Sequence, residues 1–526
     1  MIATVLENAT IVDGTGGARY TTDLAIVGER IAIVGDLRER EAAERIDCSG
    51  KIVAPGFIDV HSHSDELWLV LPGCDGKIAQ GVTTEIGGNC GTSAAPLRGT
   101  TQDAMRDSMQ RFGLDVGWRD FAEFFALVER GATALNVASL VGLGTTRAAI
   151  AGENARRLEA DELAAQGRLV RESCEQGAIG CSSGLIYPPS MYADTAELTA
   201  MADAAREGNA PLYASHVRNE GDTLLEAIDE ALAVGEGANV TVQCSHHKSQ
   251  GKNNWGKVHR SLERIDAART RGTRAFADVY PYVASWTELA TILPDDVRDG
   301  GTQATLERLR DPQRALAIAF ALSLRYAATW HDIMVTSVGS DRNAALAGMR
   351  LDDIARQWGM SPQRAALRLL DEEELDVEAV FFTMTEDDVA TVLSANFTAI
   401  GSDASIRALD GPTARGVPHP RTFGTFPRIF GRFVRQRRTL GLEEAVRRMS
   451  GLPAQIFGLA ERGTIELGGF ADLVVFDEAQ IRDTATYEQP YAFPVGIERV
   501  YVNGCAVVAD GRLTGARPGR VLRNGR

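Results

Sequence analysis

The chain has 526 residues, of which 44% are hydrophobic and 24% charged, a composition typical of a globular protein with a large core. Its 55 basic and 71 acidic residues give a net charge of −16, which argues against nucleic acid or an anionic membrane as the main partner. No leader-like segment opens the sequence and no run approaches 18 apolar residues, so we expect a cytoplasmic protein.

Short alternating segments separated by glycines occupy residues 1–55 and return in residues 455–526. Alternation of apolar and polar residues is typical of strands that bury one face. We therefore expect the two chain ends to pair into one small β-sandwich domain.

Between these ends, eight short apolar runs alternate with stretches whose apolar residues recur every three to four positions, as in helices. The runs span residues 57–60, 83–87, 136–141, 178–182, 212–215, 240–245, 275–280 and 398–402. Clear helical stretches span residues 159–172, 195–206, 223–234 and 257–271. This α/β alternation predicts a closed (β/α)8 TIM-like barrel over residues 56–454, with active groups at the carboxyl ends of its strands.

The first apolar run leads directly into His61 and His63. Side chains alternate along a strand, so both imidazoles point to one side and can converge on a metal such as zinc. For an isolated pair, a surface turn that happens to carry histidines is the alternative. Only 8 histidines occur in the chain, and other ligand types recur at later strand ends, which favours the metal.

Three more strand ends carry candidate metal ligands, and a fourth carries a carboxylate. Cys90 follows a Gly-Asn turn after the second run, where its thiolate could reach a metal or remain a buried thiol. His216 and His246 follow the fifth and sixth runs, and Asp403 follows the eighth. The 7 cysteines form no closely spaced pairs, which argues against a disulfide framework.

A long span, from Trp286 to about Val377, separates the seventh and eighth runs. A usual strand-helix unit is far shorter. We expect an inserted, lid-like subdomain at about residues 286–377.

Six short motifs in the right order give the chain a family resemblance. They are HSHSD (61–65), GGNCG (87–91), SHVRNEG (215–221), SHHK (245–248), DVYPY (278–282) and GSD (401–403). Together they resemble the D-aminoacylases, the N-acyl-D-amino-acid deacylases of the amidohydrolase superfamily, along essentially the whole chain. The resemblance implies zinc-dependent hydrolysis of N-acyl-D-amino acids to a carboxylate and a free D-amino acid.

The resemblance also implies a ligand set. Cys90, His216 and His246 match the ligands of one tightly held Zn²⁺, while His61 and His63 match a second, weakly occupied position. Three protein ligands with an open fourth position are typical of catalytic zinc. Many relatives bridge two metals with a carboxylated lysine after strand four, but residues 179–184 contain no lysine. A carbamate-bridged pair of metals is therefore not expected.

Asp403 matches the catalytic carboxylate that transfers a proton from the attacking water to the leaving nitrogen. A loop or capping residue is the alternative for Asp403, and Ala404 replaces the glycine that usually follows it. Candidates for binding the substrate carboxylate are the cationic and hydroxyl side chains on loops after strands: Lys248, Tyr187, Tyr280, Ser285, Arg218 and Arg421. Arg421, Lys248, Tyr280 and Ser285 are favoured. Lys248 could instead be a solvated surface lysine, Arg218 could pair with an acid such as Glu220, and Tyr187 could serve packing.

Two other functions compete with the deacylase. Opening of a cyclic amide, such as a hydantoin or dihydropyrimidine, belongs to the same superfamily, but the missing strand-four lysine counts against it. A structural protein derived from an enzyme should lack some ligands, whereas here every ligand position and Asp403 are filled. The partner that we expect is a small-molecule substrate.

Overall fold

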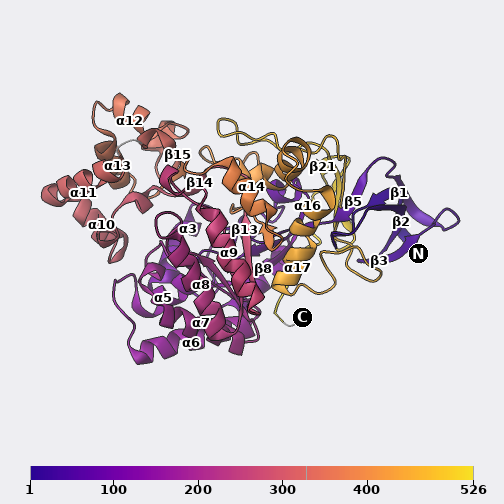
Figure 1. The fold of residues 1–526 in the computed structure, drawn as a ribbon, viewed down its shortest axis with the longest axis horizontal. Coiled ribbons are helices and arrows are strands. Elements are labelled where there is room, and N and C mark those ends of the chain that lie inside the picture. The colour runs from indigo at the N-terminus through magenta and orange to yellow at the C-terminus, as the bar shows by residue number, and fades with distance from the viewer. Residues whose placement is uncertain (1, 327–328, 525–526) are drawn as a thin grey trace.

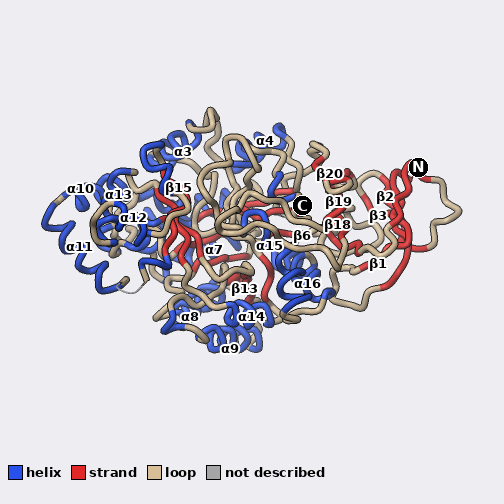
Figure 2. Tube along the Cα trace, turned by 90° about the horizontal axis from the view of Figure 1, so that it is seen from above, coloured by secondary structure: helices blue, strands red, loops and turns tan. Residues whose placement is uncertain are grey.

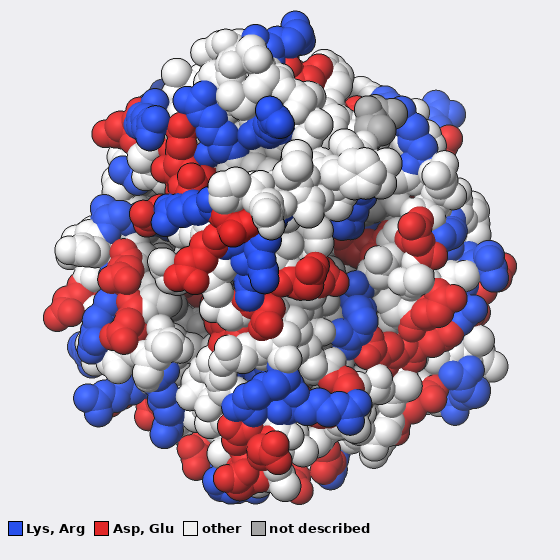
Figure 3. Space-filling view, turned by 90° about the vertical axis from the view of Figure 1, so that its left-hand side faces the viewer, with Lys and Arg blue, Asp and Glu red and all other residues white. Residues whose placement is uncertain are grey.

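The computed structural model describes residues 2–326 and 329–524. Three parts follow one another along its long axis: helices α10–α13 lie at one end, the barrel helices in the middle, and strands β1–β3 at the other end (Figure 1). No helix in the described part of the chain has the length and apolar character needed to span a membrane. Figure 3 views the molecule from the end that carries α10–α13. On this face, basic and acidic side chains are interspersed and form no large patch of one charge.

The central part is a ring of short parallel strands, as the sequence predicts. They are β6 (Phe57–Asp59), β7 (Val82–Gly87), β8 (Asn136–Ser139) with β9 (Val141–Gly142), β10 (Cys181–Gly184), β11 (Leu212–His216), β12 (Thr241–Cys244), β13 (Ala275–Val279) and β17 (Thr398–Ile400). Hydrogen bonds link them in the orders β6-β7-β8 and β9-β10-β11-β12-β13-β17, and only Leu140 separates β8 from β9. Between β17 and β6 the ring closes just beyond the strands, where Ser62 bridges Ala404.

Helices between the strands cover the barrel. The longer ones are α3 (Thr100–Gln110), α4 (Phe121–Gly131), α5 (Leu143–Ala151), α6 (Ala160–Glu175), α7 (Thr195–Glu207), α8 (Leu224–Ala238), α9 (Lys257–Thr270), α14 (Glu386–Ser394), α15 (Arg421–Arg428), α16 (Leu442–Met449) and α17 (Gly451–Phe457). Each buries an apolar face; in α8, Leu225, Ile228 and Leu232 are buried at helical spacing. The Asp194 side chain caps α7 by accepting from the Glu197 amide. The four predicted helical stretches correspond to α6–α9.

The two chain ends pair into a single sheet of nine strands. Its strands are β1 (Ile2–Ile11), β2 (Tyr20–Val27), β3 (Arg30–Gly35), β4 (Ala42–Asp47), β5 (Ile52–Pro55), β18 (Leu473–Phe476), β19 (Ile497–Val502), β20 (Cys505–Ala509) and β21 (Arg512–Leu513). Antiparallel pairing of β5 with β18 joins the N-terminal strands to the C-terminal ones. Side chains from both ends, among them Leu6, Leu24, Val53 and Leu473, form one buried cluster.

The insertion has its own sheet and its own core. Strands β14 (Ser285–Glu288), β16 (Val377–Phe381) and β15 (Ile333–Val338) pair antiparallel in that order. Its helices are α10 (Gly301–Arg310), α11 (Pro312–Arg325), α12 (Leu351–Gln357) and α13 (Pro362–Glu372), whose buried residues cluster apart from the barrel core. The first residue of β14, Ser285, pairs with the last of β16, Phe381, so the insertion leaves and rejoins the barrel at one place. Figure 2 shows it projecting from the barrel.

The last described residues, 519–524, run beside Val137 in β8. The Arg520 carbonyl accepts from the Val137 amide (2.9 Å) and the Leu522 amide donates to the Val137 carbonyl (2.7 Å). The Gly519 amide donates to the Thr133 carbonyl at 2.8 Å, and the Asn524 amide donates to the Gly177 carbonyl at 3.2 Å. The tail therefore supplies hydrogen bonds that a neighbouring barrel strand would otherwise supply.

Deletion of residues 519–526 is expected to destabilise the barrel. Losing the four backbone hydrogen bonds of the tail at roughly 1 kcal/mol each should cost about 4 kcal/mol, and the melting temperature should fall by about 3–5 °C. Differential scanning fluorimetry measures the shift. Arg523→Ala is the control, because it removes a partly exposed ion pair with Glu129 and a contact with the Phe125 ring but none of these backbone hydrogen bonds. Equal melting temperatures for the truncated and full-length chains would show that the tail is dispensable.

Candidate metal centre and active site

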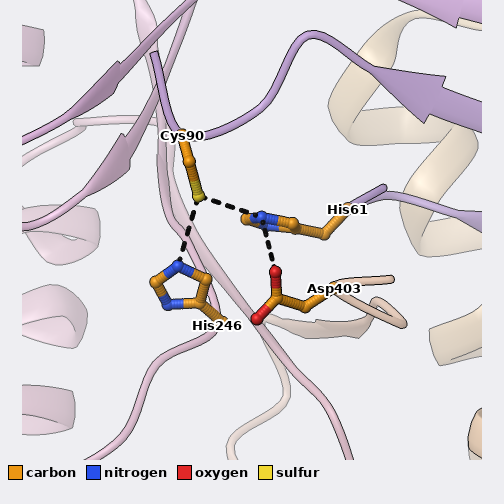
Figure 4. A group of neighbouring side chains, drawn as sticks. All are labelled: His61, Cys90, His246 and Asp403. Atoms are coloured by element: carbon orange, nitrogen blue, oxygen red, sulfur yellow. Dashed lines mark hydrogen bonds and ion pairs between the residues drawn. The ribbon is translucent and has the colours of Figure 1, made fainter. Parts of the chain in front are cut away.

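Side chains from four barrel strand ends converge at the carboxyl end of the ring. Figure 4 shows His61, Cys90, His246 and Asp403, which follow β6, β7, β12 and β17 and are all buried. Cys90 Sγ lies 3.4 Å from both His61 Nε2 and His246 Nε2. His216, the last residue of β11, adds its Nδ1 at 3.6 Å from the same sulfur.

Three of these residues have backbone conformations that side chains with a Cβ rarely adopt. Cys90, His246 and Asp403 have φ values of 53°, 36° and 52°. Such left-handed conformations cost free energy and persist at functional sites where the surrounding structure enforces them. In each case the residue lies two or three positions beyond the end of a strand, in the turn that follows it.

The donor atoms fit a zinc ion. With Zn–N near 2.0 Å and Zn–S near 2.3 Å, neighbouring ligand atoms of a tetrahedral site lie roughly 3.3–3.6 Å apart, as the distances from Cys90 do. His216 Nδ1 and His246 Nε2 are closer, at 2.9 Å, which is the spacing of two nitrogens that share a proton. Burial opposes ionisation of Cys90, but His61 and His246 outweigh it and hold the thiol pKa well below its usual value. A thiolate among imidazoles is the chemistry of a zinc ligand.

His61 and His63 both contact Asp403. His61 Nε2 lies 3.5 Å from an Asp403 carboxylate oxygen, and His63 Nε2 lies 3.0 Å from the same oxygen. The structure thus brings together all five predicted ligands and Asp403, and Cys90 contacts His61, His216 and His246.

Two carboxylates that the sequence analysis did not assign orient the ligands. Glu220 lies 2.9 Å from His246 Nδ1, so it can accept a hydrogen bond from that nitrogen while Nε2 faces the cluster. Asp278 accepts from the His246 amide at 2.8 Å and lies 3.3 Å from His61 Nδ1. Both residues lie inside quoted motifs, SHVRNEG and DVYPY, and that was the signal available in the sequence.

Tyr280 lies between two cations beside the cluster. The Lys248 ammonium is 5.5 Å from the centre of its ring, and the Arg421 guanidinium is 4.7 Å from it. The buried Tyr280 hydroxyl and Arg421 Nε form no hydrogen bond with any residue that the structure describes. Arg421 Nη1 forms an ion pair with Asp403 at 2.9 Å, although its direction is not that of a hydrogen bond. Lys248 itself is held by Glu220 and by the His246 carbonyl, so it is buried and not a solvated surface lysine.

The remaining hydroxyl candidates line the same side. Tyr187 stacks edge-on against His216, with ring centres 5.2 Å apart, and its hydroxyl pairs with Thr287 of β14 at 2.8 Å. Ser285 begins β14 and is buried. The buried His419 accepts a hydrogen bond from the Arg421 amide through Nδ1, at 3.0 Å. It therefore positions Arg421.

Arg218, also predicted to bind substrate, makes its contacts elsewhere. Its guanidinium bonds both oxygens of Glu230 at 2.9 Å and the carbonyls of Met191 and Ala193 at 2.7 and 2.8 Å. These contacts use its donors to fasten the loop after β10 to α8. The expected acid partner exists, but it is Glu230 and not Glu220.

Comparison with known proteins gives consistent matches along the whole chain. Residues 44–508 match the model of the amidohydrolase family. Over 521 residues the chain is 38% identical to an N-acyl-D-glutamate deacylase of Alcaligenes xylosoxydans xylosoxydans, covering 99% of this chain and 96% of the relative. A D-aminoacylase of the same organism is 37% identical over 518 residues, covering 98% and 97%.

A solved structure extends the match to three dimensions. It is the N-acyl-D-glutamate deacylase of Bordetella bronchiseptica, complexed with zinc and a phosphonate inhibitor that mimics the tetrahedral intermediate of the reaction. Its TM-score is 0.84 at 36% sequence identity, and the alignment covers 99% of both chains.

Proposed function

Because the chain belongs to the amidohydrolase family, and within it to the D-aminoacylases, we propose that it hydrolyses N-acyl-D-amino acids to a carboxylate and a free D-amino acid. One observation supports this function above the others. Asp403 contacts the metal-ligand cluster through one carboxylate oxygen and the buried cation Arg421 through the other, at 3.0 and 2.9 Å. The reacting centre and a site for a substrate carboxylate are therefore adjacent.

Cys90, His216 and His246 would hold one zinc ion tightly, and His61 and His63 would contribute to a weaker second site. When bound, the ion supplies Lewis acidity, which acidifies water and polarises the amide carbonyl. Charge compensation supports this set, because a thiolate and neutral imidazoles suit a dication.

Asp403 would move the proton. Burial raises the pKa of Asp403, but Arg421, His246 and His63 outweigh burial and hold it well below its usual value, so the side chain is a carboxylate. In that form it can take a proton from the attacking water and pass it to the leaving nitrogen. Amide hydrolysis needs the second transfer because an amide anion is a very poor leaving group.

Arg421, Lys248, Tyr280 and Ser285 would bind the α-carboxylate. Arg421 is almost fully buried and has an unpaired Nε, and the nearby Tyr280 hydroxyl is also unpaired. A carboxylate accepting from both groups would satisfy buried donors that have no partner among residues 2–326 and 329–524. Tyr187 and Thr287 would line the neighbouring wall.

The partner in this proposal is a small molecule, and the cell compartment is the cytoplasm. A reducing compartment keeps a thiolate such as Cys90 available as a ligand. None of the 7 cysteines forms a disulfide, and six of them are buried.

A substrate panel tests the reaction class. The protein should release amine from N-acetyl-D-Leu, N-acetyl-D-Met or N-acetyl-D-Glu, measured with an amine-reactive reagent, and should leave 5-substituted hydantoins unopened. Rapid opening of hydantoins, without cleavage of any open-chain substrate, would replace the proposed function by cyclic-amide hydrolysis.

Arg421→Met is expected to reduce kcat/KM for an N-acyl-D-amino acid by about tenfold to a hundredfold, the value of a charged hydrogen bond. The matched substrate is the corresponding N-acyl-D-amino acid amide, which lacks the carboxylate. The parent enzyme should prefer the acid, and the variant should lose that preference. Equal losses on both substrates would contradict a carboxylate contact, because Arg421 would then act only through Asp403.

A further inference from the structure

A lysine with no solvent exposure lies at the seam where the barrel closes. Lys77 belongs to the short helix α2 (Asp75–Ile78), between β6 and β7. Its ammonium lies 2.6 Å from Asp59 Oδ2, 2.7 Å from Ser402 Oγ, 2.9 Å from the Ala404 carbonyl and 3.0 Å from Glu85 Oε1. Both carboxylates are as fully buried as the lysine.

The partners of Lys77 flank the active-site residues along the chain. Ser402 and Ala404 stand on either side of Asp403. Asp59 accepts from the Ser402 amide at 2.8 Å and from the His61 amide at 3.3 Å. One buried ammonium thus joins the segment that carries His61 to the segment that carries Asp403.

Glu85 connects Lys77 to Ser64, the residue that follows His63. Its Oε1 accepts from the Ser64 hydroxyl at 2.6 Å, and its Oε2 accepts from the Trp68 indole at 2.9 Å. The Ser64 hydroxyl in turn accepts the Ile406 amide at 2.9 Å. Both ends of the segment from His61 to Ser64 are therefore fixed to the loop after β17.

The seam has no regular strand pairing, so individual contacts hold it. Within the described residues, β17 and β6 share no strand ladder, and an isolated bridge between Ser62 and Ala404 joins the segments that follow them. Asp403 also sits in the left-handed region at φ 52°, a conformation that persists only when neighbouring groups enforce it. Its amide donates to the His61 carbonyl at 2.8 Å, so a shift of either segment moves the carboxylate relative to the histidines.

We propose that Lys77 is a positioning residue that fixes the Asp403 carboxylate against His61 and His63. This role rests on the proposed function, in which Asp403 moves the proton. The reaction is sensitive to such positioning, because a misplacement of about 1 Å can cost about a hundredfold in rate.

Two variants weaken the contact to different degrees. Lys77→Met removes the ammonium but leaves two buried carboxylates unpaired, which destabilises the fold. Ser402→Ala removes one acceptor of Lys77 and leaves every charge paired. It also removes the longer contacts of this hydroxyl with the Ala404 amide, at 3.2 Å, and the His61 carbonyl, at 3.4 Å, which belong to the same seam. We expect Ser402→Ala to lower kcat by about tenfold to a hundredfold, with KM within about twofold and zinc content unchanged.

A double-mutant cycle separates positioning from general destabilisation. In an Asp403→Asn background, Ser402→Ala should cause no further loss of the residual kcat, because the group that it positions is already disabled. The control is Arg147→Met, which breaks a comparably buried ion pair with Glu197 between α5 and α7. It should lower the melting temperature without lowering kcat measured well below that temperature.

Three outcomes would overturn the role of Lys77. They are a near-normal kcat in Ser402→Ala, a loss of zinc in that variant, or the same fold loss with and without Asp403. If Lys77→Met does not fold, Ser402→Ala alone decides. A parent enzyme that cleaves no N-acyl-D-amino acid would overturn the proposed function and this role together, whereas an active parent with an unaffected variant overturns only the role.

Discussion

Asp403→Asn is expected to lower kcat by about a hundredfold to ten-thousandfold while zinc stays bound. The amide keeps the shape of the side chain but cannot accept the proton. General-base catalysis typically accelerates a reaction by a factor of that size. Asp403 faces the ligand cluster, with one oxygen 3.0 Å from His63 Nε2 and 3.5 Å from His61 Nε2. Steady-state kinetics with an N-acetyl-D-amino acid, paired with elemental analysis, measures both effects.

A matched control for this substitution lies in the nine-stranded sheet. Asp23 is also buried and accepts two backbone amides, from Asn8 and Leu37, each at 2.9 Å, but it is not part of the cluster. Asp23→Asn should therefore affect stability and leave kcat unchanged. A merely twofold loss of kcat in Asp403→Asn, or loss of its zinc, would remove Asp403 from the role of proton carrier.

Cys90→Ala is expected to abolish metal binding and activity together. As purified, the parent should hold about one tightly bound zinc per chain, because in the proposed site Cys90, His216 and His246 would complete a catalytic ligand set. Mutation of a residue that merely orients a ligand typically lowers metal affinity by about tenfold to a hundredfold. Loss of a direct ligand should therefore lower the zinc affinity by at least about a hundredfold. Elemental analysis after gel filtration, together with kcat, gives the result.

The control for the cysteine is Cys181, which is equally buried in β10 of the same barrel. Burial raises the pKa of Cys181 well above its usual value, so it is a neutral thiol. Cys181→Ala should keep its zinc. Retention of zinc by Cys90→Ala, or two equally tight metals in the parent, would contradict the assigned ligand set.

The barrel and its ligand positions could be predicted because their signals are local in the sequence. Each strand is a short apolar run, and each ligand follows its run within a few residues, as His61 follows β6 and His216 ends β11. The family and the fold class were predicted from these runs and motifs, and both predictions are confirmed.

The connections around the ligands could not be predicted because they join residues far apart in the chain. The partners of Lys77 include Ser402, more than 300 residues away, and nothing near either residue indicates the contact. Arg218 looked like a residue for binding a carboxylate, yet its donors go to Glu230 on α8 and to two backbone carbonyls. The tertiary fold of the barrel determines which side chains become partners in such contacts.

The extent of the insertion shows a different limit. Its sheet continues to Phe381, beyond the expected end near Val377, because β16 is an apolar run that in sequence looks like a barrel strand. Only its antiparallel pairing with β14 and β15 places it in the insertion.

The handedness of the substrate is the property that tests the account most directly. With the α-carboxylate held by Arg421, Lys248, Tyr280 and Ser285 and the acyl carbonyl at the metal cluster, only one direction remains for the side chain. The L-enantiomer must push its side chain into the barrel wall or give up a charged contact of roughly 1.5–3 kcal/mol.

The measurement is kcat/KM for both enantiomers of N-acetyl-Leu, N-acetyl-Met and N-acetyl-Glu. At about 1.4 kcal/mol per tenfold, the account predicts a preference for D over L of at least about tenfold for every substrate that is cleaved. A consistent preference for the L-enantiomers would contradict it.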